Sequence, residues 1–331
     1  MDVPVNRRQV LLGSGALLMP APALASRAAL EIPAGGGPLP PEWTAAEAIP
    51  LWPDAPPGAP AKPPVRSTTL DPAFITGVVR PELRVFRPAQ SNGRALLVIP
   101  GGAYTFISIR NEGTDVARVM TAHGYTVFVL VYRLPAEGWA NRADVPLQDA
   151  QRAMRVIRAG AAGFGIDPAT VAVLGFSAGG HLAASLITAA ADQVYAPRDR
   201  ADALDARPHS AGLIYPVIAA TPPHTHPLSA QNLLGPAPTP ELVTRRSPAL
   251  HVNAMTPPTF LVHSFDDEAV PYQNTMLFLD ALREARRPAE LHLFEEGGHG
   301  FGIGPANAPA GYWPTLFAAF LDRHAPRVAA A

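Results

Sequence analysis

The sequence predicts an α/β fold in which a mostly parallel central sheet is flanked by helices. From about Phe74 to the end of the chain, short apolar runs alternate with segments of helical spacing. The apolar runs are continuous, as in 127–131, which is typical of parallel strands covered on both faces. The chain has 331 residues and a hydrophobic fraction of 48%, which is ample for a sizeable core.

Each element of this alternation has its own signature. The expected strands are apolar runs at 83–86, 96–99, 127–131, 171–174, 213–215, 259–264 and 291–294. The expected helices lie within 116–123, 147–161 and 181–186, from about 272, and within 317–321. Gly124 and the 163–168 turn end the first two helices. Open α/β sheets of this kind build their sites at the carboxyl edge of the strands.

Residues 175–179, Gly-Phe-Ser-Ala-Gly, join a predicted strand to a helix-prone run. This context is typical of a nucleophile elbow, a sharp turn that exposes a serine. Glycines are needed there because bulk two residues to either side of Ser177 would clash with the neighbouring strand and helix. The free N–H groups of a helix N-terminus can also stabilise an oxyanion. We therefore predict that Ser177 is a nucleophile; the alternative is a plain Gly-rich turn.

A nucleophilic serine needs a base that is oriented by an acid, and in this type of fold the chain order is serine, acid, histidine. The predicted strand 259–264 runs into Asp-Asp-Glu at 266–268. Asp267 is the predicted acid and Asp266 the runner-up, with Glu268 less favoured. The carboxylates that are not used are expected at a helix N-cap or in an exposed turn.

His299 is the predicted base. It lies between glycines on the loop after the last predicted strand, where it is free to swing over a serine. The other histidines lack this setting. His181 is expected to pack or hydrogen-bond at a helix N-terminus, and His263 and His292 are expected to be satisfied core histidines within strands.

The loop at 100–104, Pro-Gly-Gly-Ala-Tyr, follows an early strand, where this fold places part of its oxyanion hole. Small residues let backbone N–H groups approach a developing oxyanion closely. We predict donors at Gly102, Ala103 and Ala178, and we expect Tyr104 to contact the substrate. The alternative for this loop is again a plain Gly turn.

The first 25 residues predict a signal peptide of the twin-arginine type. Arg7 and Arg8 precede an apolar stretch to Met19 that is too short to span a bilayer, and residues 23–25 form a small-residue cleavage site. We expect cleavage after Ala25 and export to a bacterial periplasm or the medium, with no stable membrane anchor. The alternative is an uncleaved amphipathic helix or an anchor.

Two other segments depart from the alternating pattern. Residues 26–66 are a Pro-rich lead, expected to be partly a disordered stem without chemistry, in which Trp43 and 49–53 can pack on the domain as a strap. The catalytic domain is expected at 67–331. Within it, the irregular stretch 217–256 is expected to cover Ser177 as a small cap; the alternative is a solvated loop.

Composition excludes several classes of function. A net charge of −1 leaves no electrostatic footprint for nucleic acid or an anionic membrane. The absence of cysteine excludes disulfides, thiolate metal sites, a cysteine nucleophile and a lipoprotein anchor. His224 and His226 form an H-x-H pair, but a metal site needs more than two ligands. We expect neither a metal nor a cofactor.

The motifs together resemble a known family. They are Pro-Gly-Gly-Ala-Tyr at 100–104, Tyr-Arg-Leu at 132–134, Gly-Phe-Ser-Ala-Gly-Gly-His-Leu at 175–182, Asp-x-x-Val-Pro at 267–271 and Gly-His-Gly-Phe at 298–301. Over roughly 48–325, the chain resembles α/β-hydrolase esterases of the carbohydrate-esterase and hormone-sensitive-lipase-like type. Within these it is most similar to the bacterial acetylxylan or xylanase-associated esterases. One departure is Ala103, which replaces the last glycine of related His-Gly-Gly-Gly or Pro-Gly-Gly-Gly loops; a backbone donor survives that change.

The resemblance implies an α/β-hydrolase fold and a serine esterase of short acyl groups, with acetyl esters on carbohydrate as the expected substrate. Alternatives within the fold are a feruloyl esterase, a short-chain lipase or a peptidase. A peptidase of this fold commonly carries a large gating domain, for which no residues remain here. An alternative from another class is a binding protein that has lost catalysis, against which the complete set of candidate catalytic residues argues.

Overall fold

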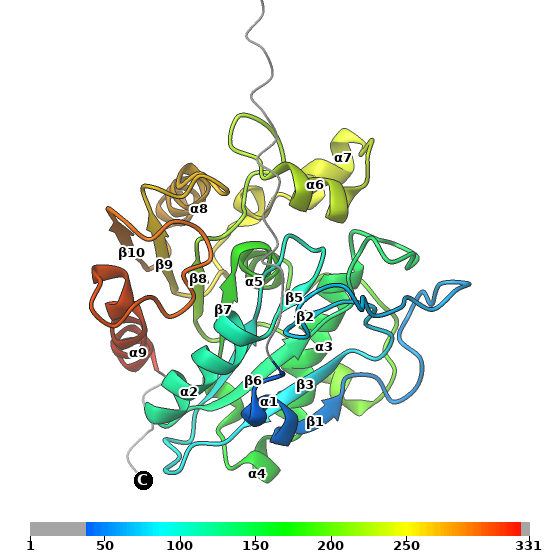
Figure 1. Ribbon diagram of the computed structural model, residues 1–331, viewed down its shortest axis with the longest axis horizontal. Helices are drawn as coiled ribbons and strands as arrows, with labels where there is room; N and C mark the ends of the chain where they lie inside the picture. Colours follow the sequence, from blue (N-terminus) through cyan, green and yellow to red (C-terminus); the bar gives the residue numbers. More distant parts are fainter. Residues whose placement is uncertain (1–37, 326–331) are drawn as a thin grey trace, which may run out of the picture. The chain divides into compact units, whose positions relative to one another are not determined.

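The computed structural model describes residues 38–325, which are built around an eight-stranded sheet (Figure 1). The strands lie in the order β1-β3-β6-β4-β7-β8-β9-β10. Their bounds in chain order are β1 Glu47–Pro50, β3 Glu82–Phe86, β4 Ala95–Ile99, β6 Thr126–Val131, β7 Val171–Phe176, β8 Ala211–Ile214, β9 Thr259–Ser264 and β10 Ala289–Phe294. The predicted signal peptide and residues 26–37 of the lead lie outside the described residues.

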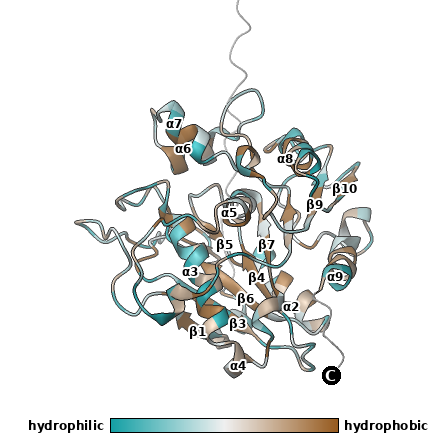
Figure 2. Cartoon of the chain, turned by 180° about the vertical axis from the view of Figure 1, so that it is seen from behind, coloured by the Kyte–Doolittle hydropathy of each residue, from teal (hydrophilic) through white to brown (hydrophobic). Residues whose placement is uncertain are grey.

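The sheet is mostly parallel, as the continuous apolar runs predict. Strand β3 pairs antiparallel with both β1 and β6, and the remaining neighbours are parallel. Strands β4, β6, β7, β8 and β9 are buried along their whole length, and Figure 2 shows hydrophobic residues concentrated in the central sheet. A separate pair, β2 Phe74–Ile75 and β5 Ile107–Ser108, was not predicted, because two-residue strands carry no periodic signal.

Helices flank this sheet. Their bounds are α1 Pro41–Ala45, α2 Asp115–Ala122, α3 Val145–Ala159, α4 Ala161–Phe164, α5 Ser177–Thr188, α6 Pro227–Leu234, α7 Pro240–Arg245, α8 Gln273–Glu284 and α9 Trp313–His324. Helix α2 packs with α9, and α3 packs with α5. No helix among the described residues is both long and apolar enough to cross a membrane.

Two glycines show that α5 and α9 cover opposite faces of the sheet. A Cβ on Gly175 would lie 2.6 Å from Ala183 of α5, and a Cβ on Gly212 would lie 2.8 Å from Phe317 of α9. Gly212 pairs in register with Leu174, the neighbour of Gly175 in β7. Because successive residues of a strand face opposite sides, the two helices lie on opposite faces. The predicted α/β architecture is therefore confirmed.

The end of the Pro-rich lead is part of this fold. Strand β1 extends the sheet at the edge next to β3, and Trp43 and Trp52 are buried. The indole of Trp52 donates to Asp149 Oδ1 over 2.8 Å, and Arg152 Nε donates to the carbonyl of Leu51 over 2.7 Å. The sheet thus begins before residue 67, the position where the catalytic domain was expected to start. This strand was not predicted because a four-residue edge strand that ends in proline has no clear strand pattern.

The insertion at 217–256 is more regular than its composition predicts. It contains α6, α7 and a 3₁₀ turn at Pro248–His251, and each of these begins with a proline, which suits the first turn of a helix. In Figure 1, α6 and α7 lie above and to the right of α5, away from β1, β3 and β6. The segment is a small helical insertion at the edge of the sheet where the predicted site residues lie.

Candidate active site

Ser177 occupies the sharp turn between β7 and α5. Its φ is +51°, a left-handed conformation that a non-glycine residue adopts only under constraint. A Cβ on Gly175 would lie 2.4 Å from the carbonyl oxygen of Gly179, and a Cβ on Gly179 would lie 2.2 Å from that of Ile99. Both glycines therefore allow β7, α5 and the end of β4 to meet around Ser177.

The structure brings Ser177, His299 and Asp267 into one chain of hydrogen bonds. Ser177 Oγ lies 2.9 Å from His299 Nε2, and His299 Nδ1 lies 2.7 Å from Asp267 Oδ2. The three residues follow β7, β10 and β9, which end at the same edge of the sheet. Asp267 is buried, whereas the imidazole of His299 keeps 19% of its surface exposed.

Both oxygens of the Asp267 carboxylate accept hydrogen bonds. Its Oδ1 accepts hydrogen bonds from the backbone N–H groups of Ala269 and Val270, over 3.0 and 2.8 Å. Its Oδ2 contacts His263 Nε2 at 3.1 Å as well as His299. Burial alone would raise the pKa of Asp267, but hydrogen bonds from His263 and His299 and the charge of His299 lower it to about 2.

His263 thus has a partner that its strand position did not reveal. It is a fully buried histidine in β9, as expected, and both of its ring nitrogens are engaged. Nδ1 lies 2.7 Å from Thr275 Oγ1, and Nε2 reaches the carbonyl of Val270 at 2.9 Å as well as Asp267. Since both partners of Nε2 are acceptors, this nitrogen carries a proton and donates it toward Asp267.

Asp266, the runner-up, has another partner. Its side chain is exposed and accepts hydrogen bonds from the backbone N–H groups of Gly298 and Gly297, over 2.8 and 3.2 Å. It therefore fastens the loop that carries His299. Glu268 is exposed. Of the three consecutive acids, Asp267 is the one that contacts the histidine.

The loop at 100–104, the predicted oxyanion loop, bends sharply beside Ser177. Gly102, Ala103 and Tyr104 all have positive φ, at 126°, 54° and 57°. A Cβ on Gly101 would lie 2.8 Å from Cβ of Ser177, so this loop runs directly against the predicted nucleophile. Within residues 38–325 no backbone hydrogen bond uses the N–H of Gly102 or Ala103. Both groups are available to a ligand, although Ala103 tolerates its left-handed conformation less easily than glycine would.

The third predicted donor, Ala178, is the second residue of α5. The first N–H groups of an α-helix have no acceptor four residues earlier in the same helix, so that of Ala178 points out of the helix N-terminus. The helix dipole adds partial positive charge at the same place. Ala178 follows Ser177 directly, which puts this group beside the serine oxygen.

The insertion fastens the oxyanion loop from outside. Asn232 of α6 donates through Nδ2 to the carbonyl of Ala103 over 2.9 Å and to Thr105 Oγ1 over 2.8 Å. Arg142 Nε in turn donates to the carbonyl of Asn232 over 2.7 Å. At its start, the insertion meets the nucleophile itself, because Val217 N–H donates to the carbonyl of Ser177 over 3.0 Å.

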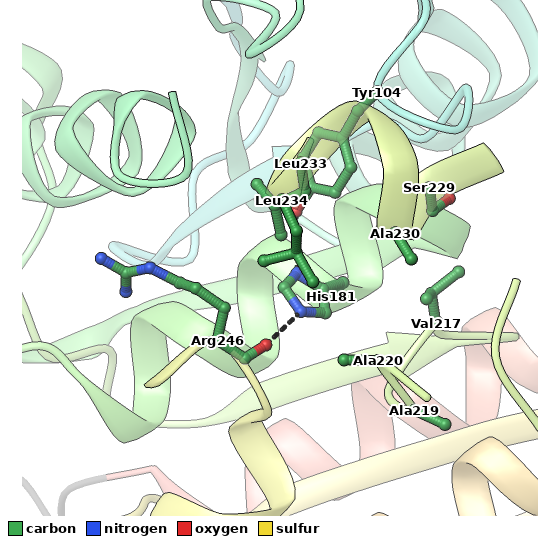
Figure 3. Close-up of a pocket in the computed structure, with 10 residues that line it drawn as sticks. All are labelled: Tyr104, His181, Val217, Ala219, Ala220, Ser229, Ala230, Leu233, Leu234 and Arg246. Carbon is green, nitrogen blue, oxygen red and sulfur yellow. Dashed lines mark hydrogen bonds between the residues drawn. The ribbon is translucent and has the colours of Figure 1, made fainter. Parts of the chain in front are cut away.

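An apolar pocket lies between the insertion and α5 (Figure 3). Tyr104 is almost fully buried in its wall, and its hydroxyl lies 2.9 Å from His181 Nδ1. His181 Nε2 lies 2.9 Å from the carbonyl of Arg246, so Nε2 donates and the Tyr104 hydroxyl donates to Nδ1. Burial lowers the pKa of His181 to about 4. The other lining residues are Val217, Ala219, Ala220, Ser229, Ala230, Leu233 and Leu234.

Two further histidines, His226 and His292, have local partners. His226 Nδ1 lies 2.8 Å from Ser229 Oγ, and burial lowers the pKa of His226 to about 4. His292, expected in the core, is half-buried and contacts Glu290 at 2.8 Å. In the described part of the chain, no group of three or more His, Cys, Asp or Glu side chains is placed to hold a metal ion.

Glu112 and Tyr215 were not predicted from the sequence. Glu112 is buried and accepts hydrogen bonds from Gly101 N–H over 2.7 Å and from the Tyr215 hydroxyl over 2.9 Å. Glu112 lies in a π-helical turn at Arg110–Thr114, a polar stretch with no apolar periodicity. Tyr215 was predicted only as the end of a strand, and nothing in its sequence context marks its side chain as part of a site.

The sheet order, the nucleophile turn and the three converging loops define an α/β-hydrolase. Residues 83–282 match the model of the BD-FAE family. The chain belongs to this family.

Two curated relatives agree with this family assignment. The chain is 32% identical to an acetylxylan esterase of Xylanibacter ruminicola over 223 residues, which cover 66% of this chain and 43% of that protein. It is 36% identical to endo-1,4-beta-xylanase B of Butyrivibrio fibrisolvens over 208 residues, covering 63% and 32%. The chain therefore matches less than half the length of these relatives.

Solved structures match over more of their length. An acetyl ester-xyloside bifunctional hydrolase from Caldicellulosiruptor lactoaceticus has a TM-score of 0.70 and 33% identity, covering 84% of this chain and 96% of that one. A thermophilic esterase from Thermogutta terrifontis, solved with propionate bound, has a TM-score of 0.64 and 25% identity, covering 87% and 98%. These matches confirm the α/β-hydrolase fold and the predicted resemblance to acetylxylan esterases.

Proposed function

We propose that this chain is a serine esterase that hydrolyses short-chain acyl esters, with acetyl esters of carbohydrate as its substrates. The observation that carries the proposal is the hydrogen-bonded chain from Ser177 Oγ through His299 to Asp267, with distances of 2.9 and 2.7 Å. A base within hydrogen-bond reach of a serine, itself oriented by a buried acid, is the arrangement that makes a serine nucleophilic.

The first half-reaction follows from this geometry. Ser177 Oγ attacks the acyl carbon while His299 Nε2 takes its proton, and the carbonyl oxygen becomes an oxyanion. Asp267 stays ionised, because its pKa of about 2 lies far below neutral pH, and it stabilises the imidazolium that forms. His299 then gives the proton to the departing alcohol oxygen, which leaves an acyl group on Ser177.

The second half-reaction releases the acid. Water loses a proton to His299 and attacks the acyl carbon, and the bond to Ser177 Oγ breaks as that oxygen regains a proton. In both steps the N–H groups of Gly102, Ala103 and Ala178 are the proposed oxyanion donors. Two of them have no partner in the described chain and the third lies at a helix N-terminus, so they are oriented before the charge develops.

The substrate class rests on the relatives. One relative named above is, by its name, an acetylxylan esterase, and one solved structure is that of an acetyl ester-xyloside bifunctional hydrolase. The pocket between the insertion and α5 is lined mostly by alanines, leucines and a valine, and its wall residue Val217 donates to the carbonyl of Ser177. Such a lining suits a small apolar acyl group. A carbohydrate acetyl ester presents such a group on a polar alcohol.

The test measures acetate released from acetylated xylan by the full chain, alongside turnover of p-nitrophenyl acetate, butyrate and octanoate. Ser177→Ala is the control, and we expect it to lower kcat/KM by at least about 1,000-fold. Release from xylan that is lost in the variant supports the whole proposal. Turnover of p-nitrophenyl esters alone leaves a serine esterase with another alcohol, and activity that survives Ser177→Ala contradicts the mechanism.

A further inference from the structure

Glu112 is a buried carboxylate that the proposed reaction does not use directly. It is 4% exposed and lies in the π-helical turn before α2. Its Oε2 accepts the N–H of Gly101, the residue that leads into the oxyanion loop and lies against Cβ of Ser177. The carboxylate therefore fixes the peptide from which the proposed donors at Gly102 and Ala103 extend.

The other oxygen of Glu112 reaches the histidine loop through Tyr215. Oε1 accepts the Tyr215 hydroxyl over 2.9 Å, and the same hydroxyl accepts the N–H of Gly302 over 3.0 Å. Gly302 lies three residues after His299. The ring of Tyr215 also packs edge-on against the imidazole of His299, with ring centres 5.0 Å apart. Tyr215 has a φ of +37°, so its backbone is constrained in this position.

Both partners of Glu112 are donors, so the ionised carboxylate satisfies them best. Within residues 38–325 no Lys, Arg or His forms an ion pair with it. Burial raises the pKa of Glu112, while the hydrogen bonds from Gly101 and Tyr215 and the charge of His299 oppose that rise. Burying a carboxylate without a cation costs free energy. If this position only filled space in the core, an apolar side chain would do so without that cost.

We propose that Glu112 is a positioning residue that holds the oxyanion loop and the His299 loop in one fixed relation to Ser177, through Gly101 on one side and Tyr215 on the other. The inference rests on the proposed function. Two of the proposed oxyanion donors, Gly102 and Ala103, come from one loop and the proposed general base from another, and a rate enhancement requires both loops to meet the same carbonyl. Glu112 is the buried group that contacts both supports.

Glu112→Gln tests this role with little change in shape. The amide has one acceptor oxygen for two donors, so one of the two supports is lost. We expect kcat to fall about 10- to 100-fold, because small misplacements of catalytic groups cost about that much, while KM changes less than about threefold. We also expect the affinity for a short alkylboronic acid, which binds the serine as a tetrahedral adduct, to fall by a similar factor. Glu284→Gln, which removes the same charge from an exposed position in α8, should match wild type.

Tyr215→Phe is the second variant, because it keeps the ring beside His299 but loses the bonds to Glu112 and Gly302. We expect kcat to fall about tenfold, with weaker boronate binding. A Glu112→Gln protein that folds and stays within twofold of wild type in both kcat and boronate affinity overturns the inference. If Glu112→Gln does not fold, Tyr215→Phe decides by the same criteria.

Ser177→Ala, measured in parallel, separates this inference from the proposed function. Turnover that survives Ser177→Ala rejects the proposed function. Turnover that depends on Ser177 but is indifferent to Glu112→Gln and Tyr215→Phe rejects only the positioning role.

Discussion

At the scale of single residues, the conformation of Ser177 depends on two neighbouring glycines, which have no side chain. The positive φ of Ser177 is maintained because Gly175 and Gly179 let three elements approach within contact distance of the turn. A Cβ at Gly179 would meet the carbonyl oxygens of Ile99 and Pro100, which are backbone atoms and cannot move aside as a flexible side chain can. The strain at Ser177 is therefore maintained by packing around it.

Gly179→Ala should consequently lower both stability and activity. The added Cβ would lie 2.2 Å from the Ile99 oxygen, so β4 and α5 must separate, and we expect a loss of about 2 kcal/mol or more in the free energy of unfolding. Urea unfolding and kcat/KM measure the two effects. The matched control is Gly163→Ala in α4, where a Cβ meets nothing within 4 Å; it should be neutral or stabilising by up to about 1 kcal/mol. Equal stability of the two variants would contradict this account.

The residues that could be predicted from sequence are those whose chemistry is marked locally. Ser177 lies two residues from a glycine on either side, Asp267 lies between two acids, and His299 lies between two glycines. Each occurs on the segment that follows an apolar run, so the motif and the strand end can be recognised together. Glu112 has no such mark, because its partner Tyr215 lies 103 positions away and the contact exists only once β8 and the π-helical turn meet. His263 was placed correctly in a buried strand, but its bond to Asp267 depends on the turn that follows β9.

At the scale of elements, α6 is the part of the insertion that touches the proposed oxyanion hole. Asn232 holds the carbonyl of Ala103 and the hydroxyl of Thr105 with one amide nitrogen. Arg142 fixes α6 from the other side through the carbonyls of Gln231 and Asn232. The position of this helix is therefore coupled to the conformation of the loop whose N–H groups are proposed to bind the oxyanion.

Asn232→Ala should reduce kcat by about three- to tenfold with little loss of stability, because the loop loses its outer support but keeps the bond from Gly101 to Glu112. The measurement is kcat and KM on p-nitrophenyl acetate, with a melting curve to confirm folding. Gln231→Ala, an exposed neighbour on the same helix, is the control and should behave as wild type. Indistinguishable kinetics of the two variants would show that α6 does not support the loop.

Some helices and strands can be predicted from the sequence more accurately than others. The buried strands were located to within one or two residues, because a continuous apolar run has few other uses in a chain of this composition. Helix α5 begins at Ser177, although helix-prone residues start at His181, because packing against β7 and β8 outweighs the low helix propensity of its glycines. In 217–256 the helices are short and contain or follow prolines, so periodicity had too few turns to show.

At the scale of the whole molecule, buried ionisable groups link the site to the pH range in which the fold is stable. His181 and His226 are both buried near Ser177, and burial lowers the pKa of each to about 4. In the unfolded chain each titrates near its ordinary value of 6.5. Between these values the unfolded chain binds more protons than the folded one, so acidification favours unfolding.

The free energy of unfolding should therefore be largest above about pH 7 and should fall as the pH is lowered toward 4, with each histidine contributing up to about 1.4 kcal/mol per pH unit within the window. Asp267, whose folded pKa is about 2, lowers the stability further only below about pH 4, so the two effects are separable.

Urea unfolding at pH 7.5, 6.0 and 4.5 measures how steeply the free energy of unfolding changes with pH. His181→Gln, whose amide can still donate to Arg246 and accept from Tyr104, should make the slope shallower, whereas His123→Gln on the surface should leave it unchanged. A wild-type stability that is level across this range would mean that the two histidines are not held neutral by the fold, and the close packing of the insertion on α5 would then need another explanation.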